Sequence, residues 1–395
     1  MRTVDGVDAM RREADHTVPV YPQLPFVPIR AAGCDLFTED GRQVLDLYGG
    51  HAVACLGYGH PALTRAIEKQ SRRLLFQSNA VALDVRAEAA EKLTAAAPAA
   101  LTRAFFVNSG AEANENALRM ALTATGRGKV LAITHGFHGR TAAAAAVTWN
   151  SDKWYGFPSR PFEVGFIPRN DSVAAVDMID DRVAAVIVEP IQGVAGAFDL
   201  APDFLATLRN ETARHGALLI ADEVQSGMGR SGRFFACKVH AIEPDLLTAA
   251  KSLAGGIPAG AVLATDAVAG HFGAGMLGTT FGGGPLAAAA TVAVIDAIHA
   301  ENLLANVRAR EIEIRERCTV GPVVRIQGAG LLLGLVCDRP AVEIRDALLD
   351  HDILTGTSSD PRVLRILAPL VLESKHVERL QHALASIPPA HPSTS

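Results

Sequence analysis

The chain has 395 residues, of which 49% are hydrophobic and 20% are charged, and its formal net charge is -5. This length suits one large domain with a smaller partner and an extensive core. The mildly acidic balance and the lack of a basic run argue against a nucleic-acid-binding protein.

Targeting and redox features favour a cytoplasmic protein. The first ten residues are acidic and polar, unlike a signal peptide, and no apolar stretch reaches the roughly 18 residues that a membrane helix needs. The five cysteines are odd in number and scattered, without the spacing of metal ligands. We therefore expect reduced thiols, no metal site and no membrane association.

The first two parts of the chain differ in their patterns. Residues 1–45 should form an arm that is rich in proline between Pro19 and Pro28, followed by a hairpin that turns at Asp40-Gly41. Residues 46–285 alternate apolar strands with helical segments. This alternation predicts a large α/β domain, of the kind that binds cofactors, built around a mostly parallel sheet.

The remainder, residues 286–387, reads as a smaller α+β domain. It begins with an alanine-rich helix over 286–300, continues through a helical stretch at 311–317 and includes a strand at 331–336. The tail 388–395 has nothing to bury and is predicted to be disordered.

The first chemical motif is a short strand at 105–107 that leads through Ser109 and Gly110 into an alanine-rich amphipathic helix. The free amides of Gly110 and Ala111, the Ser109 hydroxyl and the positive end of the helix dipole would suit a phosphate. Serine is also a common ordinary N-cap. Taken alone, the motif leaves both interpretations open.

Two further strands are followed by side chains that could bind a ligand or take part in a reaction. After the strand at 130–132 come Phe137, which could stack on a planar ring, and Arg140, whose fork geometry suits a carboxylate. His138 between them is either a hydrogen-bonding group of the site or an ordinary loop histidine. A buried strand at 183–188 ends in Glu189.

The pair Asp222 and Lys251 is the most informative feature. Asp222 ends the apolar strand 217–221, and Lys251, 29 residues later, is the one lysine that lies between an apolar run and a Gly-Gly turn. A lysine among small apolar residues loses hydration of its ammonium form and becomes a nucleophile that condenses with an aldehyde. A carboxylate can keep a pyridine nitrogen protonated, so the pair predicts pyridoxal 5'-phosphate as cofactor.

The order of these motifs resembles the class III, or omega, aminotransferases, which have the type I fold of pyridoxal-phosphate enzymes. Within them the chain is most similar to acetylornithine and ornithine aminotransferases, from about residue 36 to residue 372. The resemblance rests on these stretches: Asp46-Leu-Tyr-Gly-Gly-His-Ala-Val53, Gly57-Tyr-Gly-His-Pro61, Asn108-Ser-Gly-Ala-Glu-Ala-Asn114, Phe137-His-Gly-Arg140, Glu189-Pro-Ile-Gln-Gly193, Asp222-Glu-Val-Gln-Ser-Gly-Met-Gly-Arg230, Lys251, Thr279-Thr-Phe-Gly-Gly283 and Val363-Leu-Arg365.

The resemblance implies a role for each matching position that touches the cofactor. Lys251 would form the Schiff base and serve as general base, Asp222 would pair with the pyridine nitrogen, and Gln225 would touch the ring hydroxyl. The phosphate would lie at Ser109, Gly110 and Ala111, and Phe137 would stack on the ring. Thr280 would reach the phosphate of the neighbouring subunit, which implies a homodimer with shared active sites.

The resemblance also implies a substrate side. Arg365 and Arg140 would hold carboxylates, and Glu189 and Gly50 would lie beside the substrate. Gly50 is similar to acetylornithine enzymes, where ornithine aminotransferases tend to carry a tyrosine, and a small residue there leaves room for a bulkier donor.

Two positions depart from the family pattern. Val194 stands where ornithine and acetylornithine enzymes commonly have glutamate, and Gly284 stands where asparagine is expected. The resemblance implies that this glutamate, where it is present, acts as a switch that masks the carboxylate-binding arginine while the omega-amine donor reacts. Without it, Arg365 should stay available for a carboxylate.

The predicted function is a ping-pong transfer of an amino group from an omega-amino donor such as N-acetylornithine to 2-oxoglutarate, in arginine biosynthesis. Transaminases of ornithine, lysine or other amino acids stay open as alternatives, and so do a racemase and an aminomutase of the same family. A non-catalytic sensor that binds the cofactor or a metabolite is a third reading, which the intact Lys251 and Asp222 oppose.

Overall fold

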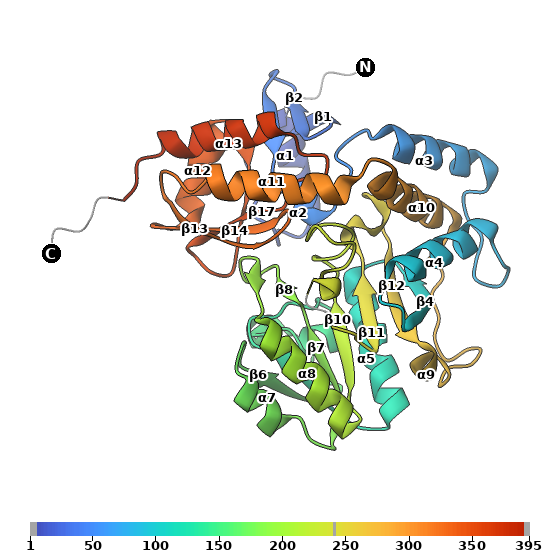
Figure 1. The fold of residues 1–395 in the computed structure, drawn as a ribbon. Coiled ribbons are helices and arrows are strands. Elements are labelled where there is room, and N and C mark those ends of the chain that lie inside the picture. The colour runs from blue at the N-terminus through green and yellow to red at the C-terminus, as the bar shows by residue number, and fades with distance from the viewer. Residues whose placement is uncertain (1–5, 240–241, 391–395) are drawn as a thin grey trace.

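The computed structural model describes residues 6–239 and 242–390. Its largest sheet has seven strands and lies in the lower half of Figure 1. The strand order is β4-β12-β11-β10-β7-β5-β6. Strand β12 is antiparallel to both of its neighbours, β4 and β11. The run from β11 to β6 is joined in parallel throughout. The expected mostly parallel sheet is thus confirmed. Its strands are β4 (Leu101–Val107), β5 (Lys129–Ile133), β6 (Glu163–Ile167), β7 (Val183–Val188), β10 (Leu218–Asp222), β11 (Leu246–Ala249) and β12 (Gly260–Thr265).

Both faces of this sheet are covered, which explains why its strands read as continuous apolar runs. Successive residues of β5 belong to different hydrophobic clusters: Leu131 packs in one and Val130 and Ala132 pack in the other. This alternation follows from the two-residue period of a strand. The covering helices of this part are α5 (Gly110–Thr125), α6 (Ala142–Ala146), α7 (Ser172–Met178), α8 (Pro202–His215) and α9 (Asp266–Ala269).

The predicted hairpin at Asp40-Gly41 is present. Strands β2 (Asp35–Thr38) and β3 (Gln43–Asp46) pair antiparallel, and β1 (Pro28–Ala32) pairs with β2. A strand from the other end of the chain, β15 (Ile353–Leu354), adds to β3 in parallel. The arm therefore shares a sheet with the C-terminal part, which local sequence patterns did not indicate.

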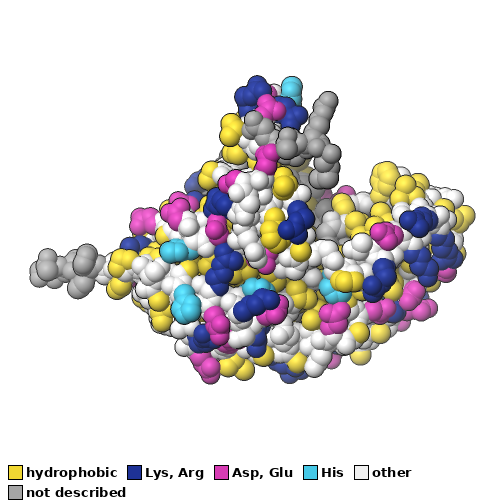
Figure 2. Space-filling model, turned by 90° about the horizontal axis from the view of Figure 1, so that it is seen from above, with side chains coloured by type: hydrophobic (Ala, Val, Ile, Leu, Met, Phe, Trp, Pro, Cys, Tyr) yellow, Lys and Arg dark blue, Asp and Glu magenta, His cyan; other side chains and the backbone are white. Residues whose placement is uncertain are grey.

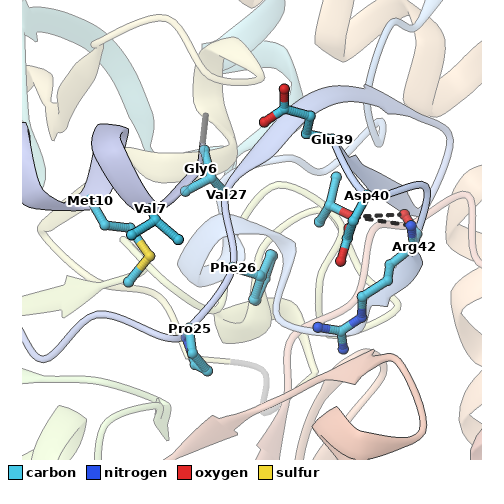
Figure 3. A pocket seen from close by; sticks show the side chains of 10 residues that line it. Gly6, Val7, Met10, Pro25, Phe26, Val27, Glu39, Asp40 and Arg42 are labelled. Carbon is cyan, nitrogen blue, oxygen red and sulfur yellow. Dashed lines mark hydrogen bonds between the residues drawn. The ribbon is translucent and has the colours of Figure 1, made fainter. Parts of the chain in front are cut away.

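The helix α1 (Gly6–His16) lies outside this small sheet and buries none of its residues. A hollow of about 350 Å³ separates it from the hairpin, and Met10, Phe26 and Asp40 are among the residues around it (Figure 3). This hollow contains none of the predicted site residues.

The C-terminal part matches its predicted elements. The helix expected at 286–300 is α10 (Pro285–Ala300), which packs against α3 (Pro61–Arg73) and α4 (Asp84–Ala96). The strand expected at 331–336 is β14 (Leu332–Cys337), and the stretch 311–317 ends a longer helix, α11. The other elements of this part are α11 (Leu303–Arg317), α12 (Ala341–Asp350), α13 (Ser374–Ser386), β13 (Val323–Ala329), β16 (Gly356–Thr357) and β17 (Val363–Ile366). Earlier in the chain lie α2 (Gly49–Ala52), β8 (Ile191–Gln192) and β9 (Phe198–Asp199).

Four of these strands form an antiparallel sheet in the order β13-β14-β17-β16, and β8 and β9 pair with each other. Two residues of the tail that was predicted to be disordered make hydrogen bonds. The Pro388 carbonyl accepts from Arg339, and the Ala390 amide donates to Asp338. Residues 391–395 lie outside the described residues. The domain boundaries at 45/46 and 285/286 stay predictions.

Three global expectations concern charge, metals and thiols. On the face shown in Figure 2, basic and acidic side chains are interspersed. Within the described ranges no group of His, Cys, Asp and Glu side chains could hold a metal ion, and all five cysteines are free and buried. Over the same ranges no single helix has the length and apolar character to cross a membrane, although the bent pair α10 and α11 passes by length and composition.

Candidate active site

The ends of the parallel strands place the predicted residues around one cavity of about 360 Å³. Such a crevice at the carboxyl edge of an open α/β sheet is where ligands bind in this class of fold. Eight of the predicted site residues line it: Gly110, Ala111, Phe137, Arg140, Glu189, Asp222, Gln225 and Lys251. Ser109, Gly50, Arg365 and Thr280 lie outside its lining.

Lys251 faces the cavity directly after strand β11, where it begins a short 3-10 turn. Burial lowers the pKa of its amine from 10.5 to about 8, although the nearby carboxylates of Asp222 and Glu189 oppose that shift. Its backbone is left-handed, with φ of 48°, a strained conformation for a residue other than glycine. The next residue fixes this turn, because the Ser252 hydroxyl donates to the Ala52 carbonyl at 2.8 Å.

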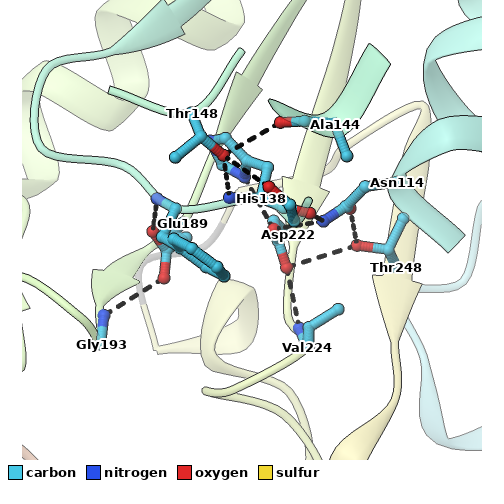
Figure 4. Close-up of polar contacts among 11 residues, drawn as sticks. Asn114, His138, Ala144, Thr148, Glu189, Gly193, Asp222, Val224 and Thr248 are labelled. Atoms are coloured by element: carbon cyan, nitrogen blue, oxygen red, sulfur yellow. Dashed lines mark hydrogen bonds and ion pairs between the residues drawn. The ribbon is translucent and has the colours of Figure 1, made fainter. Parts of the chain in front are cut away.

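Asp222 is held at the floor of the cavity by a network from several elements (Figure 4). One carboxylate oxygen accepts from Asn114 Nδ2 and meets His138 Nδ1, each at 2.7 Å, and the other accepts from the Val224 amide at 3.0 Å. Asn114 is fixed in turn, since its Oδ1 accepts from the Thr248 hydroxyl at 2.7 Å. Asp222 is 3% exposed, so its orientation is set before any ligand arrives.

This network decides the open question about His138. The histidine is 2% exposed and bonded to Asp222, so it is a hydrogen-bonding group of the site rather than an ordinary loop residue. Asn114 is a functional residue that the sequence reasoning quoted within a motif but gave no role. Its position four residues after Gly110, on the same face of α5, was a usable signal.

The start of α5 combines both interpretations left open for Ser109. Its hydroxyl accepts from the Glu112 amide at 3.1 Å, as in an ordinary N-cap. Gly110 and Ala111 face the cavity with the first-turn amides of a 16-residue helix. Gly110 also packs so closely on Val224 that an added Cβ would lie 2.6 Å from Val224 Cγ1. The helix start is therefore suited to an anion and has no space for a side chain at Gly110.

Glu189 connects two loops of the site. Its carboxylate accepts from the Phe137 amide at 2.8 Å and from the Gly193 amide at 3.2 Å. Burial and the neighbouring Asp222 raise its pKa to about 7. Although it lines the cavity, as expected of a residue beside the substrate, both of its oxygens are bound to backbone, which positions Phe137.

Arg365 lies on β17 and is 4% exposed. Its Nε donates to the Thr357 carbonyl at 2.7 Å, and one terminal nitrogen donates to the Tyr48 hydroxyl at 3.0 Å. A weaker contact at 3.4 Å reaches the carbonyl of Gly193, the residue before Val194. Burial lowers the pKa of Arg365.

Of the other two predicted residues outside the lining, Gly50 belongs to the short α2 and Thr280 to a loop. Gly50 lies in a left-handed turn with φ of 55°, and an added Cβ there would approach only the Tyr58 hydroxyl, at 3.8 Å. Thr280 is exposed on the loop before α10, next to Phe281, which is 65% exposed and packs on the ring of Phe76.

Two aromatic residues near the site were missed by the sequence reasoning. Tyr21, on the N-terminal arm, lines the cavity. Trp154 lies under the guanidinium of Arg140, with 4.4 Å between the Arg140 Cζ and the ring centroid. Neither has a local signal, because the first lies in a proline-rich arm and the second in an irregular segment.

The residues present fit a phosphorylated pyridine aldehyde. Gln225 is 5% exposed, yet neither its amide nitrogen nor its amide oxygen has a partner among the described residues. Such a buried, unsatisfied amide fits a ligand that carries a hydroxyl group. Together with the amine of Lys251, the carboxylate of Asp222 and the amides of α5, it matches the four polar groups of pyridoxal 5'-phosphate: the hydroxyl, the aldehyde, the pyridine nitrogen and the phosphate.

Comparison with known proteins identifies the family. The model of the family "Aminotransferase class-III" matches residues 18–387. The chain belongs to the class-III aminotransferases. It is a pyridoxal-phosphate-dependent transaminase with the type I α/β fold, as the sequence predicted.

Named relatives of this class-III aminotransferase agree with that assignment. The acetylornithine aminotransferase of Corynebacterium efficiens is 38% identical over 377 residues, which cover 93% of each chain. The ornithine aminotransferase of Toxoplasma gondii has a TM-score of 0.90 at 26% identity, covering 96% of this chain and 94% of the other. The acetylornithine aminotransferase of Elizabethkingia anophelis has a TM-score of 0.86 at 27% identity, covering 97% and 100%.

Proposed function

We propose that this class-III aminotransferase moves the terminal amino group of a donor such as N-acetylornithine to 2-oxoglutarate by a ping-pong mechanism. The observation that carries the proposal is one cavity that holds the amine of Lys251, the carboxylate of Asp222 and the guanidinium of Arg140. The names of the relatives at 38% identity favour the acetylated donor.

The chemistry follows from what each residue holds. When bound, pyridoxal phosphate supplies an aldehyde that captures the donor nitrogen and a ring that accepts electrons when the adjacent C–H bond breaks. Burial lowers the pKa of Lys251 to about 8, which favours a neutral amine at this position, and that amine would accept the proton and return it. The carboxylate of Asp222, fixed by Asn114 and Val224, would pair with the pyridine nitrogen and hold a proton there.

Substrate orientation decides which bond breaks. Arg140 at the cavity wall and Arg365 behind Gly193 would hold carboxylates, and Glu189 fixes Phe137 for stacking on the ring. These contacts would select the C–H bond that is presented to the amine of Lys251.

A homodimer is part of the proposal. Around Thr280 the exposed apolar side chains of Phe281 (65%), Leu75 (61%) and Phe76 (44%) form a surface of the kind that a partner subunit covers. A second copy of the chain seated here would bring Thr280 toward its neighbour's phosphate site. Light scattering should give a mass near 83 kDa, about twice the 41.5 kDa of one chain.

The free, buried state of all five cysteines supports a reducing, cytoplasmic location. Fractionation of the producing cell would test it, since recovery in an oxidising or membrane compartment contradicts this part.

The activity is tested with purified holoenzyme and a panel of N-acetylornithine, ornithine, lysine and gamma-aminobutyrate, each with 2-oxoglutarate. We expect glutamate to form fastest with N-acetylornithine, and the donor alone to convert the cofactor to its amino form. Faster formation of glutamate with ornithine or lysine would show that the donor is that amino acid instead of N-acetylornithine. Stereochemical inversion or amino-group migration without conversion of the cofactor would establish the racemase or aminomutase alternative instead.

A further inference from the structure

The guanidinium of Arg140 is held in an unusual way for a residue of this cavity. Its Cζ lies 4.4 Å from the centroid of the Trp154 ring, which is a cation–π contact. No hydrogen bond or ion pair joins this guanidinium to any residue that the structure describes. The N–H donors of Arg140 are therefore free for a ligand in the cavity that it lines.

The backbone of Arg140 is fixed on both sides, whereas its side chain has the Trp154 ring as its one ring or polar contact among the described residues. Gly139 before it has φ of 140°, and an added Cβ there would lie 2.9 Å from the Cβ of Ala111. Thr141 after it donates to Glu115 at 2.5 Å. A long arginine side chain on a fixed backbone still has many rotamers, and the Trp154 ring is the one ring or polar contact that limits them among the described residues.

Trp154 is itself anchored beside the cavity. Its amide donates to the Ser151 carbonyl at 2.9 Å, and Ser151 is 1% exposed. The neighbouring Tyr155 hydroxyl donates to the carbonyl of Ala142, in the first turn of α6, at 3.1 Å. The segment thus fixes the backbone from which the indole ring extends, without using any donor of Arg140.

A ring against the face of a guanidinium leaves its N–H edges open, and those edges match the two oxygens of a carboxylate. We propose that Trp154 is a positioning residue that holds Arg140 for a carboxylate of the amino donor. Trp154 thereby favours donors that carry a carboxylate remote from the reacting amine. This inference rests on the proposed transamination but not on which donor is physiological.

The test compares two donors that differ only in the carboxylate: N-acetylornithine and N-acetyl-1,4-diaminobutane. In Trp154→Ala, the ratio of their kcat/KM values should fall about five- to tenfold, through a higher KM for N-acetylornithine. The value of kcat and the rate with the diamine derivative should stay within about twofold. Trp154→Phe should restore most of the ratio, because its ring still stacks on the guanidinium.

Two controls separate positioning from folding. Trp149→Ala removes an exposed ring from the same region, one that contacts His135 and Phe166 rather than Arg140, and it should leave the ratio unchanged. In an Arg140→Ala background, Trp154→Ala should have no further effect on the ratio, since the two residues act as a unit.

Equal losses with both donors, or no loss with either, would overturn the inference. So would an undiminished effect of Trp154→Ala in the Arg140→Ala background. If the parent enzyme does not use N-acetylornithine, the donor assignment fails by itself. The same ratio is then measured with the active amino acid and its decarboxylated amine, for example lysine and 1,5-diaminopentane.

Discussion

At the floor of the cavity Asp222 is 3% exposed and hydrogen-bonded to Asn114, His138 and Val224, whereas at the wall Arg140 is exposed and contacts one aromatic ring. The floor should keep its geometry with or without a ligand, because Asn114 and His138 beside the carboxylate are buried and are themselves bonded to further residues. The wall leaves its donors free for the ligand. Changes at the floor should therefore remove the chemistry, and changes at the wall should alter the choice of substrate.

The largest loss is expected for Lys251→Ala. The covalent bond to the cofactor aldehyde and proton transfer both need this amine, so multiple turnover should be abolished. The amides of Gly110 and Ala111 should still retain cofactor, because they bind its phosphate. Steady-state assays with cofactor content measured in parallel check this prediction. Turnover near the parent rate would show that another group is the base.

Asp222→Asn should slow proton removal by several orders of magnitude while the fold stays intact, since an amide cannot keep the pyridine nitrogen protonated. Asn114→Ala is the matched change, because it leaves the carboxylate and removes one donor that orients it. We expect a smaller loss, on the order of 10- to 100-fold, by analogy with supporting residues of metal ligands. Single-turnover rates decide both. A rate for Asp222→Asn within about tenfold of the parent contradicts its role.

Burial of Lys251 also predicts how stability depends on pH. Its pKa is lowered from 10.5 to about 8 in the folded, cofactor-free protein, so between these values the unfolded chain binds more protons. Stability should rise with pH across this window, be fully present above 10.5 and be lost as pH falls toward 8.

Urea unfolding of the cofactor-free parent and Lys251→Met at both ends of that window tests the prediction. The variant should lack the rise, which is on the order of a few kcal/mol. Lys69→Met, which removes an exposed lysine of α3, should keep it. An identical pH dependence in the parent and Lys251→Met would mean that the amine keeps its ordinary pKa in the fold.

The smallest effect is expected for Val194→Glu, at the wall. Val194 lines the cavity, and the carbonyl of the preceding Gly193 contacts Arg365. A glutamate here should give Arg365 an ion-pair partner and weaken carboxylate capture in the donor half-reaction.

The ratio of donor half-reaction efficiencies for ornithine or gamma-aminobutyrate over donors whose alpha-carboxylate lies on Arg365 should then rise several-fold. Single-turnover conversion of the cofactor to its amino form measures it. An unchanged or reversed ratio would place the control of specificity elsewhere, at Gly50 or Arg140.

Much of the floor was predictable, because its signals are local. Lys251, Asp222 and the start of α5 each follow an apolar strand within a few residues, and such strand ends converge at one edge of a parallel sheet. The hairpin at Asp40-Gly41 and the helix at 286–300 likewise depend on turn residues and periodicity that neighbouring residues display.

What only the tertiary structure decided involves residues far apart in the chain. The pairing of β15 with β3 joins positions about 308 residues apart, as between Ile353 and Leu45, and no local pattern encodes it. Glu189 binds the amide of Phe137, 52 residues away, and His138 meets Asp222 across 84 residues. By itself, the sequence determined the cofactor, the fold class and eight of the residues that line the cavity. Packing decided what holds those residues in place, because buried polar groups find their partners only once distant elements have come together.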